Sequence, residues 1–245
     1  TATKARPPRV GDIWQLQLNL RPFLALGTFG FGTVSDASIV RRMEEQISLH
    51  LRLEPLGFGF SDEGNVVAIA GDFIVAYDTD LFEVGLGAGW SAVSDDIAKV
   101  EYDSQGRSTG TVEHVHSGLS IAQIARLGAL DGMHVSVHNN FLFFHGEFHY
   151  GGTVGQFQVP VTSRAWMIVR GGGGKAGYVY GEVGLRVLAT GNGDRGSFFI
   201  TPTIGMAQLF DEKERDCVDA FEPSACVESV SYGGPMVGIG VEWRY

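Results

Sequence analysis

Apolar and polar residues alternate along most of this chain, beginning at Trp14. Near the N-terminus the apolar positions are Trp14, Leu16, Leu18 and Leu20, and the polar positions between them are Gln15, Gln17 and Asn19. Near the C-terminus Val237, Ile239, Val241, Trp243 and Tyr245 alternate with Gly238, Gly240, Glu242 and Arg244. Because successive side chains of a β-strand point to opposite faces, this period of two predicts strands with one apolar and one polar face.

The alternating stretches, with turn-forming residues between them, predict an antiparallel all-β fold. Ten strands are expected, at 13–25, 46–60, 66–77, 81–92, 133–144, 147–161, 164–174, 178–190, 196–209 and 234–245. Residues 112–127 suit a short helix as well as a strand. If they form a strand, another must be hidden near 23–34 and the total becomes twelve, whereas merged hairpins would give eight. Longer loops are expected at 26–45, 93–132 and 210–233.

Two architectures fit such strands. In a soluble sandwich or barrel the apolar face forms the core, whereas in a transmembrane barrel it faces lipid and the polar face lines the interior. The expected strands are long enough to cross a bilayer when tilted, and their polar face carries many glycines. Aromatic residues gather at strand ends, as in the girdles of membrane barrels, at Trp14, Tyr77, Trp90, Trp166, Tyr178, Trp243 and Tyr245. Together these features favour the transmembrane barrel.

Composition removes several other classes. The chain has 245 residues, of which 44% are hydrophobic, so it can bury a core and is not a disordered chain. Its formal charge is −10, which disfavours nucleic acid as a partner. No run approaches 18 apolar residues, which excludes a helical membrane span. We expect a single barrel domain at 13–245 after an N-terminal extension at 1–12.

The C-terminal residues Gly240, Trp243 and Tyr245 resemble the terminal signal of bacterial outer-membrane β-barrel proteins, which the outer-membrane assembly machinery recognises. Gly238 departs mildly from that pattern, because the equivalent position is often polar. The resemblance implies an integral barrel in the outer membrane of a Gram-negative bacterium, in contact with outer-membrane lipid and with the assembly machinery as a partner. It also implies an even number of strands and long extracellular loops. By the ten-strand count, 26–45 and 210–233 are extracellular, and 93–132 is periplasmic or a plug in the lumen.

The polar faces of the expected strands carry charges that would line the lumen. These predicted lumen residues are Arg21, Arg52, Glu54, Asp72, Glu83, His134, His138, Glu182, Arg186 and Glu242. In a narrow barrel such groups pair and fill the interior. In a wider barrel they line water and set an ion preference.

Two cysteines, Cys217 and Cys226, lie within the expected loop 210–233. Because they are close together in one polar segment, they are read as a disulfide formed in an oxidising compartment, against the alternative of two free thiols.

Ser136 lies between His134 and His138, a combination that resembles elements of outer-membrane lipid hydrolases. On one strand, however, residues two apart are stacked about 7 Å from each other and do not hydrogen-bond. A polar ladder in the lumen is the favoured interpretation, and no catalytic residue, metal site or cofactor is predicted.

The favoured function is therefore a structural or partner-docking barrel that acts through its extracellular loops. One alternative is a narrow, porin-like channel for ions or small polar solutes, and another is a lipid-directed hydrolase. A soluble barrel or sandwich is the remaining possibility.

Overall fold

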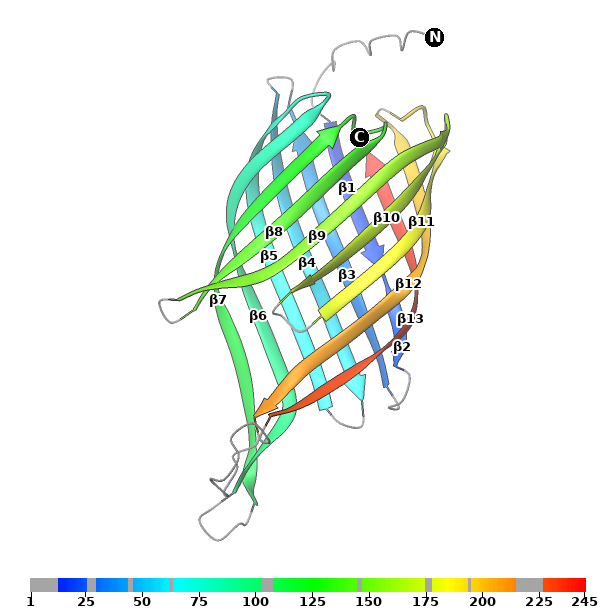
Figure 1. The fold of residues 1–245 in the computed structure, drawn as a ribbon. Coiled ribbons are helices and arrows are strands. Elements are labelled where there is room, and N and C mark those ends of the chain that lie inside the picture. The colour runs from blue at the N-terminus through cyan, green and yellow to red at the C-terminus, as the bar shows by residue number, and fades with distance from the viewer. Residues whose placement is uncertain are drawn as a thin grey trace.

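The computed structural model describes residues 13–25, 30–43, 46–61, 64–102, 108–144, 147–174, 178–193, 195–214 and 227–245. These residues form a closed, antiparallel β-barrel whose strands all tilt relative to its axis (Figure 1). No helix in these ranges is long and apolar enough to cross a membrane.

From β3 to β12, each strand is hydrogen-bonded to the strands before and after it in the chain. The strands are β1 (Ile13–Leu20), β2 (Pro22–Ala25), β3 (Gly30–Arg42), β4 (Ile47–Ser61), β5 (Gly64–Asp78), β6 (Phe82–Tyr102), β7 (Ser108–Gly128), β8 (His134–Phe144), β9 (Glu147–Thr162), β10 (Ala165–Gly174), β11 (Tyr178–Thr190), β12 (Ser197–Glu214) and β13 (Val227–Arg244). Both β1 and β2 lie between β13 and β3, separated by Arg21, so they occupy one place in the wall. The barrel therefore has twelve strands.

The ten-strand expectation is wrong, and the twelve-strand alternative describes the barrel. The two strands that the pattern did not secure are β3 and β7. In β3, apolar Val34 and Val40 are buried and face the interior, so the apolar residues do not mark the outer face. In β7, the sequence allowed a helix, but the chain pairs with β6 and β8 along its length.

The three expected loops are largely strand. Most of 26–45 is β3, and most of 93–132 is the hairpin formed by the ends of β6 and β7. The strands β12 and β13 likewise extend into 210–233. Only the short turn after β7 keeps the expected role of a plug, as its contacts show below. Cys217 and Cys226 lie outside the described residues.

The two ends of the barrel differ. The start of β1 and the C-terminus lie at the upper end in Figure 1, here called the terminal end. The β-strands are joined there by short connections, such as 79–81, 129–133 and 163–164. At the opposite end, the hairpins β6–β7 and β12–β13 project well beyond their neighbours (Figure 1).

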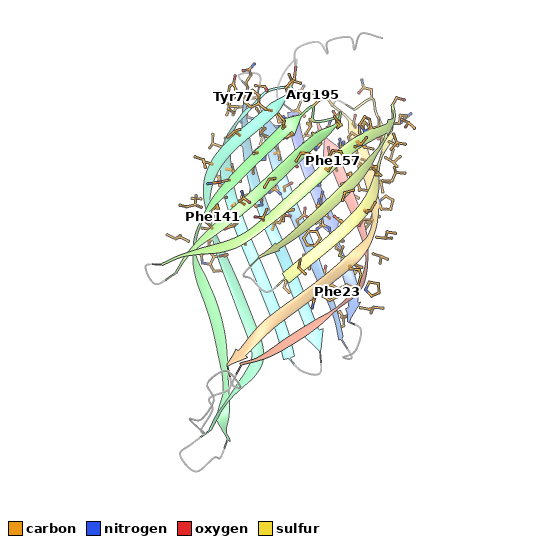
Figure 2. All side chains as sticks on the ribbon, viewed as in Figure 1. Phe23, Tyr77, Phe141, Phe157 and Arg195 are labelled. Atoms are coloured by element: carbon orange, nitrogen blue, oxygen red, sulfur yellow. The ribbon has the colours of Figure 1, made fainter. Side chains whose placement is uncertain are left out.

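The outer surface of the barrel is apolar and the interior is polar. Leu18 is 37% exposed and Leu86 is 63% exposed, whereas Glu182 in the interior is 4% exposed. Apolar side chains such as those of Phe141 and Phe157 stand on the wall in Figure 2. The barrel is thus the inverse of a soluble protein, which excludes the reading of the apolar stripe as a packed protein core.

Glycines on the inner face allow neighbouring strands to approach and curve. A Cβ atom on Gly87 would lie 2.0 Å from the carbonyl oxygen of Phe73, and one on Gly89 would lie 2.0 Å from that of Gly71. Any other residue at these positions of β6 would push β5 away. The wealth of glycine in the sequence therefore serves the tight curvature of the wall.

The barrel closes where β13 meets the first strand. Near the terminal end the seam is continuous, because β1 pairs with β13 along six residues. The backbone of Trp14 and Tyr245 adds two further hydrogen bonds, of 2.9 and 3.0 Å. The rings of these two residues stack with centroids 6.4 Å apart.

The same seam is weak beyond Arg21. Among the described residues of β2 and β13, only Phe23 and Met236 pair. Arg21 directs its backbone N–H and C=O to β3 instead of β13. Pro22 and Pro235 have no N–H to donate. This part of the wall depends on side chains inside the barrel.

A charge on the outer face tests the inverse arrangement. Leu86→Arg places a cation in the middle of the outer face of β6, and we expect it to lower the free energy of unfolding in lipid vesicles by about 2–4 kcal/mol. Leu81→Arg is the matched control, because Leu81 is 67% exposed but lies in the turn before β6, where the cost should be about 0–1 kcal/mol. Urea titration of both variants in vesicles measures the difference. Equal costs would contradict a lipid-facing Leu86.

Candidate functional site

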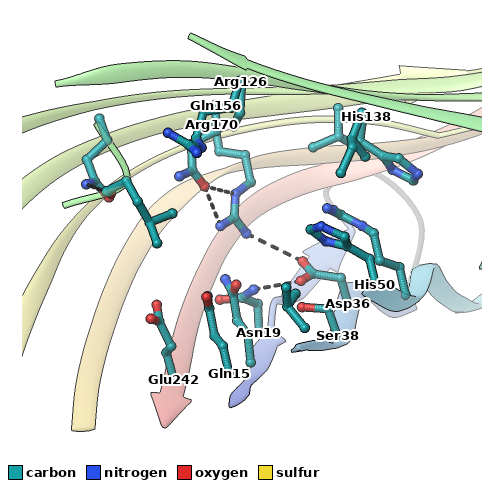
Figure 3. Close-up of a pocket in the computed structure, with 18 of the residues that line it drawn as sticks. Gln15, Asn19, Asp36, Ser38, His50, Arg126, His138, Gln156, Arg170 and Glu242 are labelled. Atoms are coloured by element: carbon teal, nitrogen blue, oxygen red, sulfur yellow. Dashed lines mark hydrogen bonds and ion pairs between the residues drawn. The ribbon is translucent and has the colours of Figure 1, made fainter. Parts of the chain in front are cut away.

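A polar cavity of about 150 Å³ lies inside the barrel, large enough for several water molecules. Residues from opposite walls line it, including Asn19, Asp36, His50, His138 and Arg170 (Figure 3). Four networks of charged side chains surround this cavity and divide the interior.

The first, the Asp36 network, joins the weak part of the seam to the far wall. It comprises Asn19, Arg21, Asp36, Arg170 and Glu182. Arg21 donates to Asp36 on β3 and, over 2.8 Å, to Glu182 on β11. Arg170 on β10 reaches across the lumen to within 3.5 Å of both carboxylates. These ion pairs tie together strands on both sides of the seam where backbone pairing is lost.

The second, the Asp72 network, crosses the lumen between β4 and β8. Its members are Arg52, Glu54, Asp72, Ser120, His138 and Asn140. His138 Nδ1 lies 3.4 Å from a Glu54 oxygen, and its Nε2 lies 3.4 Å from an Asp72 oxygen. Asn140 donates to Asp72 over 2.9 Å. The imidazole is therefore fixed between two carboxylates from different strands.

The third, the Glu83 network, lies near the terminal end. It comprises Arg42, Ser48, His50, Asp78, Glu83 and Arg126. Arg42 from β3 and Arg126 from β7 both bind Asp78 and Glu83. Two arginines and two carboxylates balance here, which offsets the cost of burying them.

The fourth, the Asp131 network, lies at the terminal end. It comprises Asp131, Arg186, Glu242 and Arg244. Asp131 belongs to the turn 129–132 between β7 and β8, yet it accepts from Arg244 on β13 over 2.8 Å and from Arg186 on β11 over 3.3 Å. Glu242 accepts from the same two arginines. The turn after β7 therefore folds across the barrel and binds to the opposite wall.

Further hydrogen bonds hold this turn. Trp166 Nε1 donates to the carbonyl oxygen of Asp131 over 2.9 Å, and Gln158 Nε2 donates to that of Leu130 over 3.1 Å. The guanidinium of Arg186 lies 3.9 Å from the centroid of the Phe199 ring, a cation–π contact. Hydrogen bonds and ion pairs therefore hold this turn inside the lumen. We call residues 129–132 the β7–β8 plug. The sequence placed Trp166 in the outer girdle, but it is 5% exposed and points inward.

The sequence-predicted lumen residues all lie in the interior. Nine are buried, and Arg52 is half-buried with 24% of its side chain exposed. The structure distributes them over all four networks, with His134 beside the plug. Sequence reasoning missed their partners Asp36, Arg42, Asp78, Arg126, Asp131 and Arg170. Arg170 and Arg126 had a signal, since each is a lone cation within an apolar or glycine-rich stretch, whereas nothing in a five-residue turn indicated that Asp131 points inward.

The Ser/His combinations do not form a nucleophilic pair. His134 Nδ1 lies 3.2 Å from the carbonyl oxygen of Ala129, and its Nε2 lies 3.5 Å from the amide nitrogen of Gln156, so the contacts of both ring nitrogens are to residues other than Ser136. Ser48, His50 and Glu83 do meet, but Ser48 Oγ and the Glu83 carboxylate contact the same His50 nitrogen. A catalytic relay needs the nucleophilic hydroxyl and the orienting carboxylate on different nitrogens of the imidazole. In the described part of the chain no group of three or more potential ligands is placed to hold a metal.

The residues of the C-terminal signal lie at the seam. Trp243 and Tyr245 are both exposed on the outer face, with ring centroids 4.9 Å apart. Gly240 faces inward, where a Cβ would lie 2.3 Å from Asn19 Oδ1. The signal residues therefore contact the first strand of the finished barrel.

No protein-family model and no curated protein matches this chain. Solved structures similar to it are outer-membrane β-barrels, the class indicated by the C-terminal residues. The translocator domain of the autotransporter NalP from Neisseria meningitidis has 14% identity and a TM-score of 0.42, over 96% of this chain and 88% of that one. A Pseudomonas aeruginosa FadL homologue has 8% identity and a TM-score of 0.48, over 95% and 90%. BamA from Haemophilus ducreyi lacking POTRA domains 1–3 has 10% identity and a TM-score of 0.30, over 95% and 70%. The similarity concerns the barrel fold alone.

Loss of one network member tests how far the interior holds the barrel together. Glu242→Ala leaves Arg186 and Arg244 with too few partners, and we expect a loss of about 3–5 kcal/mol in the free energy of unfolding. Asp80→Ala removes an exposed carboxylate near the same end and should change it by no more than about 0.5 kcal/mol. Denaturant titration in vesicles compares the two. A cost for Glu242→Ala no larger than that of the control would show that the Asp131 network is not stabilising.

Proposed function

We propose that this protein is an integral barrel of the Gram-negative outer membrane that is closed to solutes at rest and acts by docking a partner at its projecting hairpins. The observation that carries this proposal is the β7–β8 plug, which Asp131 binds to Arg186 and Arg244 across the lumen. A turn fixed in the lumen by ion pairs obstructs movement of solutes along the barrel.

The outer-membrane location is supported by the apolar outer face and the C-terminal signal residues. Membrane barrels of this class have short periplasmic turns and long extracellular loops. By that rule the terminal end is periplasmic, and the hairpins β6–β7 and β12–β13 project from the cell (Figure 1). The plug then closes the periplasmic end, and the hairpins offer the largest surface outside the membrane.

The second candidate function is a narrow channel, and the interior cavity favours it. The charged residues that line the cavity are the arginines Arg42, Arg52, Arg126, Arg170, Arg186 and Arg244 and the carboxylates Asp36, Glu54, Glu83 and Glu242. These arginines are paired with carboxylates in the four networks, so any pathway through the cavity would be lined by charges of both signs. Such a channel would require the plug to move.

We propose a non-enzymatic role. The engagement of His134 with the plug, and of Ser48 and Glu83 with one nitrogen of His50, supports this over a lipid hydrolase. Both sets lie in the lumen near the terminal end, away from the lipid that a hydrolase would need to reach.

Conductance in planar bilayers distinguishes the closed barrel from the channel. The wild-type protein should give no stable single-channel steps. Asp131→Ala removes the ion pairs of the plug and should produce conducting steps, whereas Asp80→Ala should stay silent. Stable steps from the wild type would favour the channel, and a silent Asp131→Ala barrel would contradict the plug as the barrier.

Epitope insertion tests the orientation. A tag inserted between Tyr102 and Ser108, at the tip of the β6–β7 hairpin, should be accessible to antibody on intact cells. A tag after Asp80, in the turn between β5 and β6, should be accessible only after the outer membrane is permeabilised. The reverse result would invert the barrel and move the hairpins into the periplasm.

A further inference from the structure

Among the described residues, three polar side chains form a patch on the outer face of β7, β8 and β9. Gln123 on β7, Asn139 on β8 and Thr153 on β9 alternate with inward residues and therefore point outward. Along their own strands, Gln123 lies between Ile121 and Ala125, and Asn139 lies between Val137 and Phe141. Figure 2 shows Phe141 on the wall at the left of the view.

The three residues are neighbours across adjacent strands. Gln123 pairs in register with Asn139, and Asn139 pairs with Thr153. Thr153 Oγ1 donates to Asn139 Oδ1 over 2.7 Å. The three thus form one continuous polar patch, here called the outer polar patch.

Such a patch is costly if lipid covers it. An amide in hydrocarbon without a hydrogen-bond partner costs several kcal/mol, on the order of 4–8 in a solvent that cannot hydrogen-bond. The bond from Thr153 satisfies the carbonyl of the Asn139 carboxamide, whereas no hydrogen bond among the described residues satisfies the Asn139 amino group or the exposed carboxamide of Gln123. The outer face elsewhere places Leu, Val, Ile, Phe and Met at equivalent positions. The patch therefore indicates a surface that a polar partner covers within the membrane.

Beside the patch, the outer face of β9, β10 and β11 carries a row of glycines, which have no side chains to project from the wall. Gly155, Gly171 and Gly181 pair in register across β9, β10 and β11 and point outward. A Cβ on Gly155 or Gly181 would meet nothing within 4 Å, so no packing within the barrel requires glycine there. Val137 and Met206 continue the row on either side. The glycine row lets another surface approach the backbone closely, as small residues do at other membrane interfaces.

We propose that the outer polar patch and the glycine row form a homodimer interface, in which a second copy of this chain packs against β7–β11 within the bilayer. A carboxamide both donates and accepts, so a two-fold axis that runs along the membrane normal between Gln123 and Asn139 lets Gln123 of each copy bond to Asn139 of the other.

The chemistry of the patch favours this occupant over others. The patch carries no charge, so it does not select a charged partner, and an acyl chain would leave its amides without partners. A self-complementary patch needs only the same surface on both sides, which is the definition of an isologous interface.

Cysteine cross-linking in membranes tests the proposal. In a background in which Cys217 and Cys226 are Ser, Gln123→Cys places a thiol near the axis. Leu18→Cys is the matched control, since Leu18 is also exposed to lipid but lies on β1, on the other side of the barrel. On oxidation in native membranes, Gln123→Cys should give a covalent dimer several-fold more abundant than Leu18→Cys gives. Equal cross-linking of both, or none of either, would overturn the proposal.

A second measurement guards against effects on folding. The double variant Gln123→Leu/Asn139→Leu should run as a folded barrel in heat-modifiability gels, because it matches its face better to lipid. Its mass in mild detergent should fall to that of one chain, whereas the wild type and a Leu16→Val control should keep the mass of two. A wild type of single-chain mass in both detergent and nanodiscs, or a double variant that stays dimeric, would contradict the interface.

Discussion

The polar groups inside this barrel must bond to one another, because the wall that encloses them presents hydrocarbon-compatible side chains to the outside. This requirement explains why buried arginines and carboxylates occur in balanced groups, from Arg21 with Asp36 and Glu182 to Arg186 and Arg244 with Glu242. An unpaired charge here would cost more than the ion pairs return. The same requirement leads the chain to bring a carboxylate in from a turn, since Glu242 is otherwise shared by Arg186 and Arg244 near the terminal end.

The networks also compensate for a defect in the wall. Two prolines and the turned backbone of Arg21 interrupt the hydrogen-bond ladder between β2 and β13. The side chain of that same Arg21 binds β3 and β11, on either side of the interruption. One residue therefore interrupts the backbone pairing and replaces it with ion pairs. At this part of the seam, side chains in the lumen hold the strands together instead of backbone hydrogen bonds.

Much of this arrangement was readable from the sequence, because the period of two sorts residues by face whatever the fold around them. The outward residues of β1, β6 and β13 and the inward charges of the lumen follow directly from it. The strand β3 was not readable, because its inward valines and outward alanine erase the contrast between its faces. The pairing of charges was not readable either, since Arg170 and Asp36 meet only when the sheet closes with its tilt and stagger. The inward direction of Asp131 depends on the path of a turn, and no periodic pattern describes a turn.

The joined ends of the chain have a consequence for its connectivity. The backbones of Trp14 and Tyr245 bond to each other as neighbours in one sheet, and the chain from β1 to β13 makes a full circle. The pairing of the first and last strands is therefore like that of any other neighbouring strands, except at the seam beyond Arg21. A short peptide linking residues 13 and 245 would therefore permit new termini at either projecting hairpin. The circularly permuted chain would form the same barrel, and a covalent link would join β1 and β13 at the terminal end of the seam.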